Sequence, residues 1–318
     1  MRFGLLGTGP WAHMAHAPGL AEHQDVEFVG VWGRTEAKVS AFAAEFGTKA
    51  YGDVDALLSD VEALAIALPP AVQAPLALRA AQAGKHLLLD KPVALTVAEA
   101  QDIVGTLTAG NLASVVFFTR RFLPPLASFL DEAVATGGWV EARVDHVGTI
   151  YDEGNPFGES PWRRESGGLW DVGPHALAMV LPVLGPVTEV AAMVAPRDMT
   201  HLLLRHSSGA VSKITLSVDV PPAAAREEAV FFGESGIVPV PPVPWDAVGA
   251  FGNALDDLLL AASGGPTSVM DARFAASITE ILVAAEEAAS SGRVIAVGDP
   301  PRTRRRPTTS ARGDHRQW

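Results

Sequence analysis

Residues 2–12 read RFGLLGTGPWA, an apolar stretch that runs into two glycines and then an alanine. The two glycines and Ala12 have the G-x-G-x-x-[GA] spacing of a loop that joins a strand to a helix and holds the pyrophosphate of a dinucleotide. The first glycine allows a tight turn, and the second lets the backbone approach a phosphate. The N-terminus of the helix would add free N–H groups. We therefore predict a nucleotide-binding loop that consists of Gly7, Thr8, Gly9, Pro10 and Trp11.

Beyond this loop, apolar runs alternate with segments of helical spacing as far as Phe118. The runs lack the alternation of a strand with one solvated face; they are Val26–Trp32, Glu62–Leu68, His86–Leu89 and Leu112–Phe118. The helical segments between them are Thr35–Phe46, Val72–Ala83 and Thr96–Thr108. Strands that are buried on both faces and joined by helices form a parallel, doubly wound sheet. We predict an α/β Rossmann domain over residues 1–121.

The remainder of the chain contains more strand candidates than helices. The strand candidates are Trp139–Thr149, Val187–Val194, His201–His206, Ala210–Val218 and Ala229–Phe232. Helices are expected within Leu169–Leu184 and at Asp246–Ala262 and Asp271–Ser290. We predict an α+β domain with a large, mostly antiparallel open sheet over residues 122–301. A basic, flexible tail is expected at 302–318, where six arginines face one acidic residue.

Composition excludes several classes of protein. The chain of 318 residues has no cysteine, which rules out disulfides, thiolate metal sites and a cysteine nucleophile. Its net charge of −12 disfavours nucleic acid as a partner, and we interpret the arginine-rich tail as a solvated terminus. No apolar run approaches the ~18–20 residues that a membrane span needs. Because the first residues already read as a strand, we expect no signal peptide and a cytoplasmic protein.

The end of the second apolar run indicates which dinucleotide binds. Sites that prefer NAD usually end this strand with Asp or Glu, which binds the ribose hydroxyls. Here the strand ends in Trp32-Gly33-Arg34-Thr35, and Lys38 follows one turn later. A guanidinium and a hydroxyl would hold a 2′-phosphate that a carboxylate would repel. We predict NADP, with NAD as the alternative if Arg34 and Lys38 are only solvated residues at a helix start.

Two further stretches carry residues suited to proton transfer. Lys91 is one of five lysines and lies in Asp90-Lys91-Pro92, directly after an apolar run, where parallel sheets bind ligands. Asp171 and His175 are spaced i, i+4, so one helix face can present both. Histidine exchanges protons near neutral pH, and a nearby carboxylate can orient it. Taken alone, each has a plainer interpretation: a lysine that reaches the surface, a helix-start aspartate and a core histidine.

Together, these stretches resemble the Gfo/Idh/MocA family, named after glucose–fructose oxidoreductase, inositol dehydrogenase and a rhizopine-catabolism protein. The resemblance covers nearly the whole chain. It rests on the glycine loop, Asp90-Lys91-Pro92 in place of the family's usual Glu-Lys-Pro, and the stretches Arg121–Pro124, Pro161–Arg163, Gly168–His175 and Asp271–Arg293. The Lys-Pro pair followed by Asp-x-x-x-His, in this order and spacing, is fairly specific.

The resemblance implies a Rossmann domain and an open-sheet domain that commonly mediates oligomerisation, hence a homodimer or homotetramer. It implies Lys91, Asp171 and His175 as the catalytic group beside the nicotinamide. It also implies further positions near the cofactor, namely Leu68, Pro69, Gln73, Asp90 and Lys91. This chain has Gln73 where the family frequently has His, and Thr119 where it frequently has Asn. These departures bear more on which substrate binds than on which reaction occurs. Trp162 and Arg163, in the polar loop before Gly167-Gly168, are candidates for the substrate pocket, and Arg121 is a further one.

We therefore expect an enzyme that moves a hydride between C4 of nicotinamide and a secondary alcohol or carbonyl of a sugar, polyol, diol or related small molecule. His175 would act as general base and Lys91 would stabilise the charge on the same oxygen, or the two would exchange these roles. No metal is expected. One alternative is a catalytically silent nucleotide sensor that regulates a partner protein. Another is a hydrolase that uses bound NAD transiently to cleave a glycosidic bond.

Overall fold

A computed structural model describes residues 1–298. The N-terminal part forms one parallel sheet of six strands, in the order β3-β2-β1-β4-β5-β6. The strands are β1 (Arg2–Leu6), β2 (Glu27–Trp32), β3 (Lys49–Tyr51), β4 (Ala63–Ile66), β5 (His86–Asp90) and β6 (Ser114–Phe117). This is the strand order of dinucleotide-binding folds, whose switch point lies between the first and fourth strands. The predicted Rossmann architecture is confirmed.

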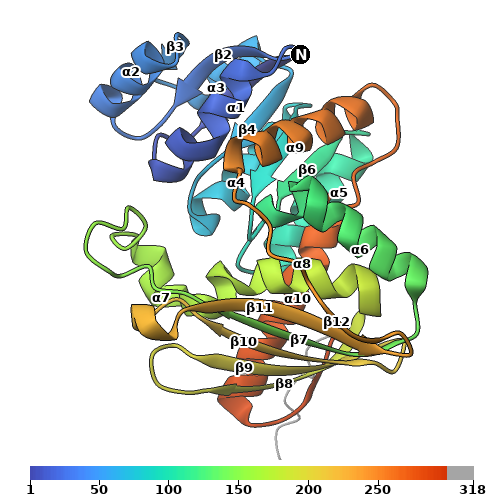
Figure 1. Cartoon of the computed structure of the whole chain (residues 1–318). Coiled ribbons are helices and arrows are strands. Elements are labelled where there is room, and N and C mark those ends of the chain that lie inside the picture. Colours follow the sequence, from blue (N-terminus) through green and yellow to red (C-terminus); the bar gives the residue numbers. More distant parts are fainter. Residues whose placement is uncertain (299–318) are drawn as a thin grey trace, which may run out of the picture.

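Helices cover both faces of this sheet (Figure 1). They are the π-helical turn η1 (Ala12–His16), α1 (Ala17–Glu22), α2 (Glu36–Glu45), α3 (Val54–Asp60), α4 (Pro70–Gln82) and α5 (Val97–Ala109). Every residue of β4 and β6 is buried, which is why these strands read as unbroken apolar runs. Thr96 is the N-cap of α5: its Oγ1 accepts the N–H of Glu99, and its hydroxyl donates to Glu99 Oε2.

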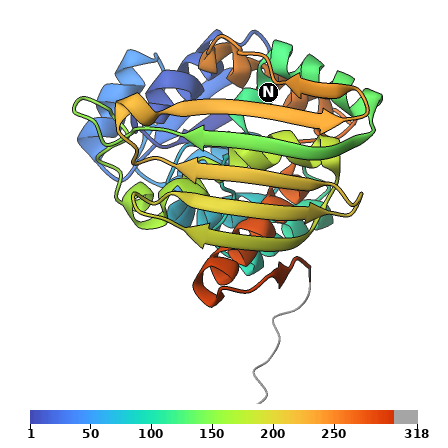
Figure 2. The same cartoon turned by 60° about the horizontal axis from the view of Figure 1, so that its bottom comes forward.

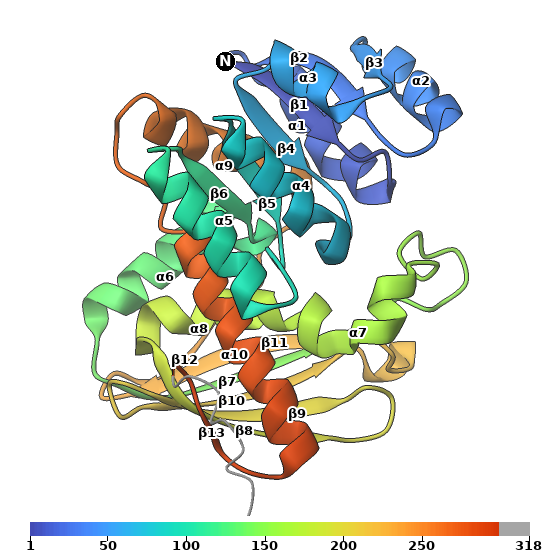
Figure 3. The same ribbon diagram turned by 180° about the vertical axis from the view of Figure 1, so that it is seen from behind.

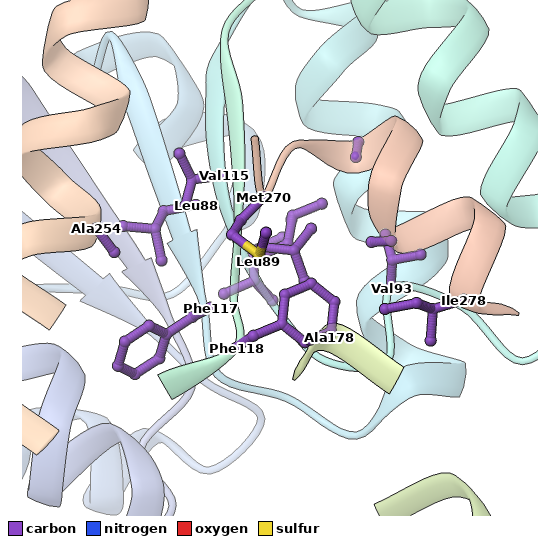
Figure 4. Packing of buried hydrophobic residues seen from close by; sticks show 14 of the residues in the cluster. Leu88, Leu89, Val93, Val115, Phe117, Phe118, Ala178, Ala254, Met270 and Ile278 are labelled. Atoms are coloured by element: carbon purple, nitrogen blue, oxygen red, sulfur yellow. The ribbon is translucent and has the colours of Figure 1, made fainter. Parts of the chain in front are cut away.

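The chain returns to the Rossmann sheet near its end. Helix α9 (Ala247–Ala262) contacts β5, β6 and η1, as Figure 1 shows beside β6. Figure 4 shows the resulting core, in which Ala254 of α9 lies near Leu88 of β5 and Val115 of β6. The last long helix, α10 (Ala272–Ser291), contacts α5 and then packs against the second sheet, on the face that the other helices also cover (Figure 3). The packing around the first sheet is therefore completed by helices that come after most of the second sheet in the sequence.

The second sheet has seven strands in the order β12-β11-β7-β10-β9-β8-β13. They are β7 (Trp139–Val147), β8 (Val187–Val194), β9 (Thr200–His206), β10 (Val211–Ser217), β11 (Arg226–Gly233), β12 (Gly236–Pro239) and β13 (Ile295–Ala296). All neighbours pair antiparallel except β7 and β10, which are parallel. Helices pack on one face, and the other face is open (Figure 2). The predicted large, mostly antiparallel open sheet is confirmed.

Two helices of this domain were not predicted. α6 (Pro124–Thr136) begins with prolines in its first turn, and α7 (Pro161–Asp171) occupies the stretch that we expected to be a polar loop. A short 3₁₀ turn, η2 (Thr119–Phe122), precedes them, and η3 (Pro222–Ala224) lies before β11. The single helix expected within Leu169–Leu184 is instead the end of α7 followed by α8 (Gly173–Leu184). The predicted tail at 302–318 lies outside the described residues.

Candidate active site

Three charged side chains meet where the two domains face each other. Lys91 Nζ donates to the main-chain oxygen of Asp171 at 2.6 Å and to Asp171 Oδ1 at 2.9 Å. Arg163 Nε donates to Asp171 Oδ2 at 2.9 Å. Burial alone would raise the pKa of Asp171, but the two cations more than offset it and the pKa is lowered. Asp171 is therefore an ionised carboxylate that holds a lysine from the loop after β5 and an arginine from α7 in fixed positions.

The loop that carries Lys91 is held from behind by Gln73. The Gln73 side chain, only 1% exposed, donates to the main-chain oxygens of Asp90 at 2.7 Å and Pro92 at 3.0 Å, and it accepts from the Asp90 N–H at 2.9 Å. The Lys91–Pro92 peptide bond is cis. We predicted Gln73 among the positions near the cofactor; its amide is buried and bonded to the backbone. Its place in the structure is that of a support for Lys91.

Asp90 lies directly beside this loop. Its Oδ1 accepts the Lys91 N–H at 2.9 Å, and its Oδ2 lies 3.9 Å from Nε2 of the buried His16. Burial raises the pKa of Asp90 to about 6. Only 8% of the residue is exposed, so a shorter acid than the family's usual glutamate still fills this position.

His175 reaches the same junction from the first turn of α8. Asp171 is the last residue of α7, so the two side chains come from successive helices and not from one helix face as we predicted. The pKa of His175 is lowered well below its ordinary value, first by burial and then by cations that include Lys91 and Arg163. Its Nδ1 atom is buried and has no hydrogen-bond partner among residues 1–298. His175 is therefore a neutral imidazole that can accept a proton.

A second histidine at the junction was not foreseen in the sequence. The ring of His146, on β7, lies 6.1 Å from that of His175, centroid to centroid. His146 Nε2 lies 3.8 Å from Glu227 Oε2, and Arg120 forms an ion pair with the same carboxylate. Burial lowers the pKa of His146 to about 3, with Arg120 contributing. Period-two alternation along β7 places His146 on the same face as the buried Val144, which is the signal that could have identified it.

Arg121, which we considered for the substrate pocket, points elsewhere. The residue is 9% exposed, and the charge that acts on its guanidinium is that of Asp131, on α6. Its neighbour Arg120 is the arginine whose charge lowers the pKa of both histidines. Adjacent residues on a 3₁₀ turn point in different directions, so the sequence did not distinguish them.

Trp162 and Arg163 lie on α7, nine and eight residues before Asp171. The Arg163 guanidinium lies over the rings of Trp162 at 4.8 Å and Phe157 at 5.0 Å. Two aromatic rings and the Asp171 carboxylate thus restrain this arginine. Trp162 acts here through Arg163.

The glycine loop has the geometry expected of a phosphate-binding turn. Gly7 has φ of 125°, and a Cβ there would lie 2.4 Å from the main-chain oxygen of Ala67. A Cβ on Gly9 would meet no atom within 4 Å, so open space lies beside the backbone where a pyrophosphate must approach. The helical turn η1 begins three residues later. These residues fit a dinucleotide.

Trp11 closes the loop toward the second domain. Its ring stacks with Phe117 of β6 at 6.1 Å and lies 6.3 Å from the rings of Phe157 and Trp245. Thr8 and Pro10 complete the loop on either side of Gly9, and Pro10 is exposed. Leu68 and Pro69 follow β4, next to β1 in the sheet, and both are partly exposed. The predicted cofactor residues other than Gln73 thus lie along the carboxyl edge of the parallel strands.

The residues predicted to distinguish NADP from NAD are exposed at the end of β2. Arg34, Thr35 and Lys38 all face solvent, and the Thr35 side chain makes no capping bond although it occupies the N-cap position of α2. Their polar groups are therefore available to a ligand. Residues 1–298 contain no group of three or more side chains that could hold a metal ion, and none of their helices is long and apolar enough to cross a membrane.

Comparison with known families agrees with this architecture. Residues 1–117 match the model of an oxidoreductase family with an NAD-binding Rossmann fold. Residues 132–238 match the model of the GFO/IDH/MocA C-terminal domain. The two matches cover the two sheets described above.

Individual relatives are similar over most of their length. The dTDP-3,4-didehydro-2,6-dideoxy-alpha-D-glucose 3-reductase of Streptomyces antibioticus is 30% identical over 248 residues, which is 74% of each chain. The UDP-N-acetylglucosamine 3-dehydrogenase of Acidithiobacillus ferrooxidans is 27% identical over 232 residues, 71% of this chain and 70% of the relative.

A solved structure shares the fold. The WlbA dehydrogenase of Bordetella pertussis, in complex with NADH and UDP-GlcNAcA, superimposes with a TM-score of 0.81 at 20% identity and covers 94% of this chain and 98% of its own. The chain therefore belongs to the Gfo/Idh/MocA family, and it is an NAD(P)-dependent oxidoreductase that acts on CH–OH groups.

Proposed function

We propose that the protein oxidises or reduces a secondary carbon of a sugar derivative, with NADP(H) preferred over NAD(H). The observation that carries this proposal is the junction itself: Lys91 and Arg163 bonded to one ionised aspartate, beside the neutral His175. The relatives named above act, by their names, at position 3 of nucleotide-linked sugars. A hexose derivative is therefore the first substrate class to test.

In the direction of oxidation, each side chain of the junction has a distinct role. A bound nicotinamide supplies the carbon that takes or gives the hydride. His175 accepts the hydroxyl proton, because a neutral imidazole has a lone pair for it. Lys91 donates a hydrogen bond to the same oxygen and stabilises the charge that develops there. Asp171 orients Lys91. In reduction the same groups act in reverse, and the alternative in which Lys91 carries the proton and His175 donates the hydrogen bond uses the same atoms.

The experiment is a substrate panel that follows the absorbance of the reduced cofactor. Free sugars, sugar phosphates, nucleotide sugars, inositols and diols are offered with NADP(H) and with NAD(H). Lys91→Ala and His175→Ala should each lower kcat by about 100-fold or more while cofactor affinity stays within twofold of wild type. Lys49→Ala, on the edge strand β3 of the first sheet, is the matched control for loss of a lysine.

Net cofactor turnover also separates this proposal from its competitors. A nucleotide sensor would bind the cofactor and convert nothing, and an NAD-assisted hydrolase would release product without a net change in cofactor. If Lys91→Ala or His175→Ala showed wild-type turnover, the substituted residue would not belong to the catalytic group.

We also propose that two or four copies associate through the open face of the second sheet, in the cytoplasm. The strand register places Met193 and Leu203 on this face, where they are 72% and 54% exposed. Exposed apolar side chains on an uncovered sheet favour an interface. Light scattering of wild type and of Leu203→Glu measures the mass; an unchanged monomer in both would contradict this proposal.

A further inference from the structure

Helix α7 is broken at Gly167, four residues before its catalytic end. Gly167 has φ of 62° and ψ of −166°, so the helix is two pieces, and the second is the single turn Gly168–Asp171. This turn lies directly against the end of β10, since a Cβ on Gly168 would fall 2.6 Å from Cα of Ser217. One turn of helix has little stability of its own. Its last residue leads through Val172, which is in helical conformation, into α8, so the first N–H groups of the turn are the ones that need a partner from elsewhere.

The carboxylate of Asp198, in the loop between β8 and β9, provides that support. Asp198 Oδ2 accepts the N–H of Gly168 at 2.7 Å, and Oδ1 accepts the hydroxyl of Ser217 at 2.5 Å and the N–H of Val218 at 3.3 Å. Gly168 is the first residue of the short turn, so its N–H has no partner within the helix. A carboxylate at this end also has favourable electrostatics with the helix dipole. Asp198 thus acts as an N-cap supplied from another part of the chain.

The backbone of this loop is strained in order to place the carboxylate. Arg197 and Asp198 have φ of 61° and 51°, left-handed conformations that are uncommon outside glycine. Such strain persists where the surroundings determine the conformation, often at functional sites. Here the single proton of the Ser217 hydroxyl is shared between Asp198 Oδ1 and the main-chain oxygen of Arg197, 2.9 Å away, and Arg197 Nη1 donates to the main-chain oxygen of Asp219 at 3.0 Å.

We propose that Asp198 is a positioning residue: by capping the turn Gly168–Asp171 it sets the Asp171 carboxylate between Lys91 and Arg163. The turn has Asp198 at one end and Asp171 at the other, so a shift at its start moves the catalytic end. The contacts of the Asp198 carboxylate include no residue of the glycine loop. The inference rests on the proposed function, because it assigns Asp198 to the chemistry through Asp171.

The test compares variants that remove the cap by degrees. Asp198→Ala removes every bond of the carboxylate and should lower kcat by about 10-fold to 100-fold, the effect of misplacing a catalytic group by about 1 Å. Asp198→Asn keeps one oxygen for Gly168 and should retain most of the activity. Ser217→Ala removes one bond and should give a smaller loss. Asp102→Asn, which changes an exposed aspartate of α5 far from this loop in the sequence, is the control and should match wild type.

Two readouts separate positioning from a merely structural role. The cofactor dissociation constant should stay within twofold of wild type, because the glycine loop is untouched. The acid limb of kcat/KM should move to higher pH in Asp198→Ala, because an Asp171 that is withdrawn from its cations ionises less readily. The charged and titratable groups that face Asp171 are Lys91, Arg163, Asp90, His146 and Tyr151.

Each outcome decides the matter. Loss of kcat with an unchanged cofactor constant and a shifted acid limb supports the positioning role. Wild-type kcat in Asp198→Ala, or a loss that disappears when rates are normalised to cofactor-binding protein, overturns it. If Asp198→Ala does not fold, Ser217→Ala becomes the test of the proposal. An unchanged kcat and an unchanged pH profile in that variant would contradict it. Full turnover in Lys91→Ala would instead overturn the proposed function.

Discussion

At the nucleotide-binding edge of the first sheet, the residues of the glycine loop follow one another in the sequence. At the junction, by contrast, Asp171 bonds to Lys91, which is 80 positions away, and to Arg163, which is eight positions away. The first region depends on backbone conformation: a left-handed glycine and open space beside Gly9. The second depends on one buried carboxylate that pairs with two cations. A contiguous motif can be recognised without knowing the fold, but a charge network exists only once the two domains have been placed together. The two regions should therefore fail in different ways when they are altered.

Removal of the Asp171 carboxylate should have the largest effect. In Asp171→Ala, two cations that are 12% and 18% exposed lose their common partner. Breaking a buried ion pair costs about 3–5 kcal/mol of stability, because a charge is left uncompensated. We expect that loss in denaturant unfolding and a fall in kcat of about 1,000-fold or more, with cofactor binding retained.

The control for this variant is Glu165→Ala, which removes an exposed acid from the same helix. It should behave as wild type in both measurements. A stable, active Asp171→Ala enzyme would show that the junction is not held by charge, and the contrast between the two regions would disappear.

The sequence predicted the first region almost completely and the second in part. The glycine loop and the Lys91 loop were found because they directly follow apolar strands. Helix α7 was taken for a loop, since it holds two adjacent glycines and breaks at the first of them. His146 was not predicted, because its role depends on which face of β7 the helices cover. The packing of α9 on the first sheet was not predicted either, because a helical pattern in the sequence does not show which sheet the helix will contact.

His16 gives the next largest effect, in the stability of the nucleotide-binding region. It is fully buried, and burial lowers its pKa to about 3, which a contact with the Trp11 backbone offsets only in part. Between pH 3 and the unfolded value of about 6.5, the unfolded chain binds more protons, so stability is lost as the pH falls. In His16→Phe this loss is absent, and the variant should gain about 3 kcal/mol on wild type between pH 7 and pH 4.

The measurement is urea unfolding of both proteins at several pH values. Any pH-independent steric cost of the phenyl ring cancels when the slopes are compared. Asp90, whose raised pKa of about 6 makes stability change with pH in the opposite direction, is present in both proteins. Parallel stability curves for the two proteins would mean that His16 is protonated in the folded state and that this region tolerates charge.

Arg34 should give the smallest effect, and one confined to the cofactor. The side chain is exposed at the end of β2, so its removal leaves the fold and the junction unchanged. A charge-assisted bond to a 2′-phosphate is worth about 1.5–3 kcal/mol, which predicts a rise of about 10-fold or more in KM for NADP(H) in Arg34→Ala. KM for NAD(H) and kcat with either cofactor should change by less than twofold. Lys38→Ala, one turn further on, should show a weaker rise of the same kind. Equal changes for the two cofactors would contradict a phosphate contact, and the preference would then have to come from another part of the nucleotide-binding edge.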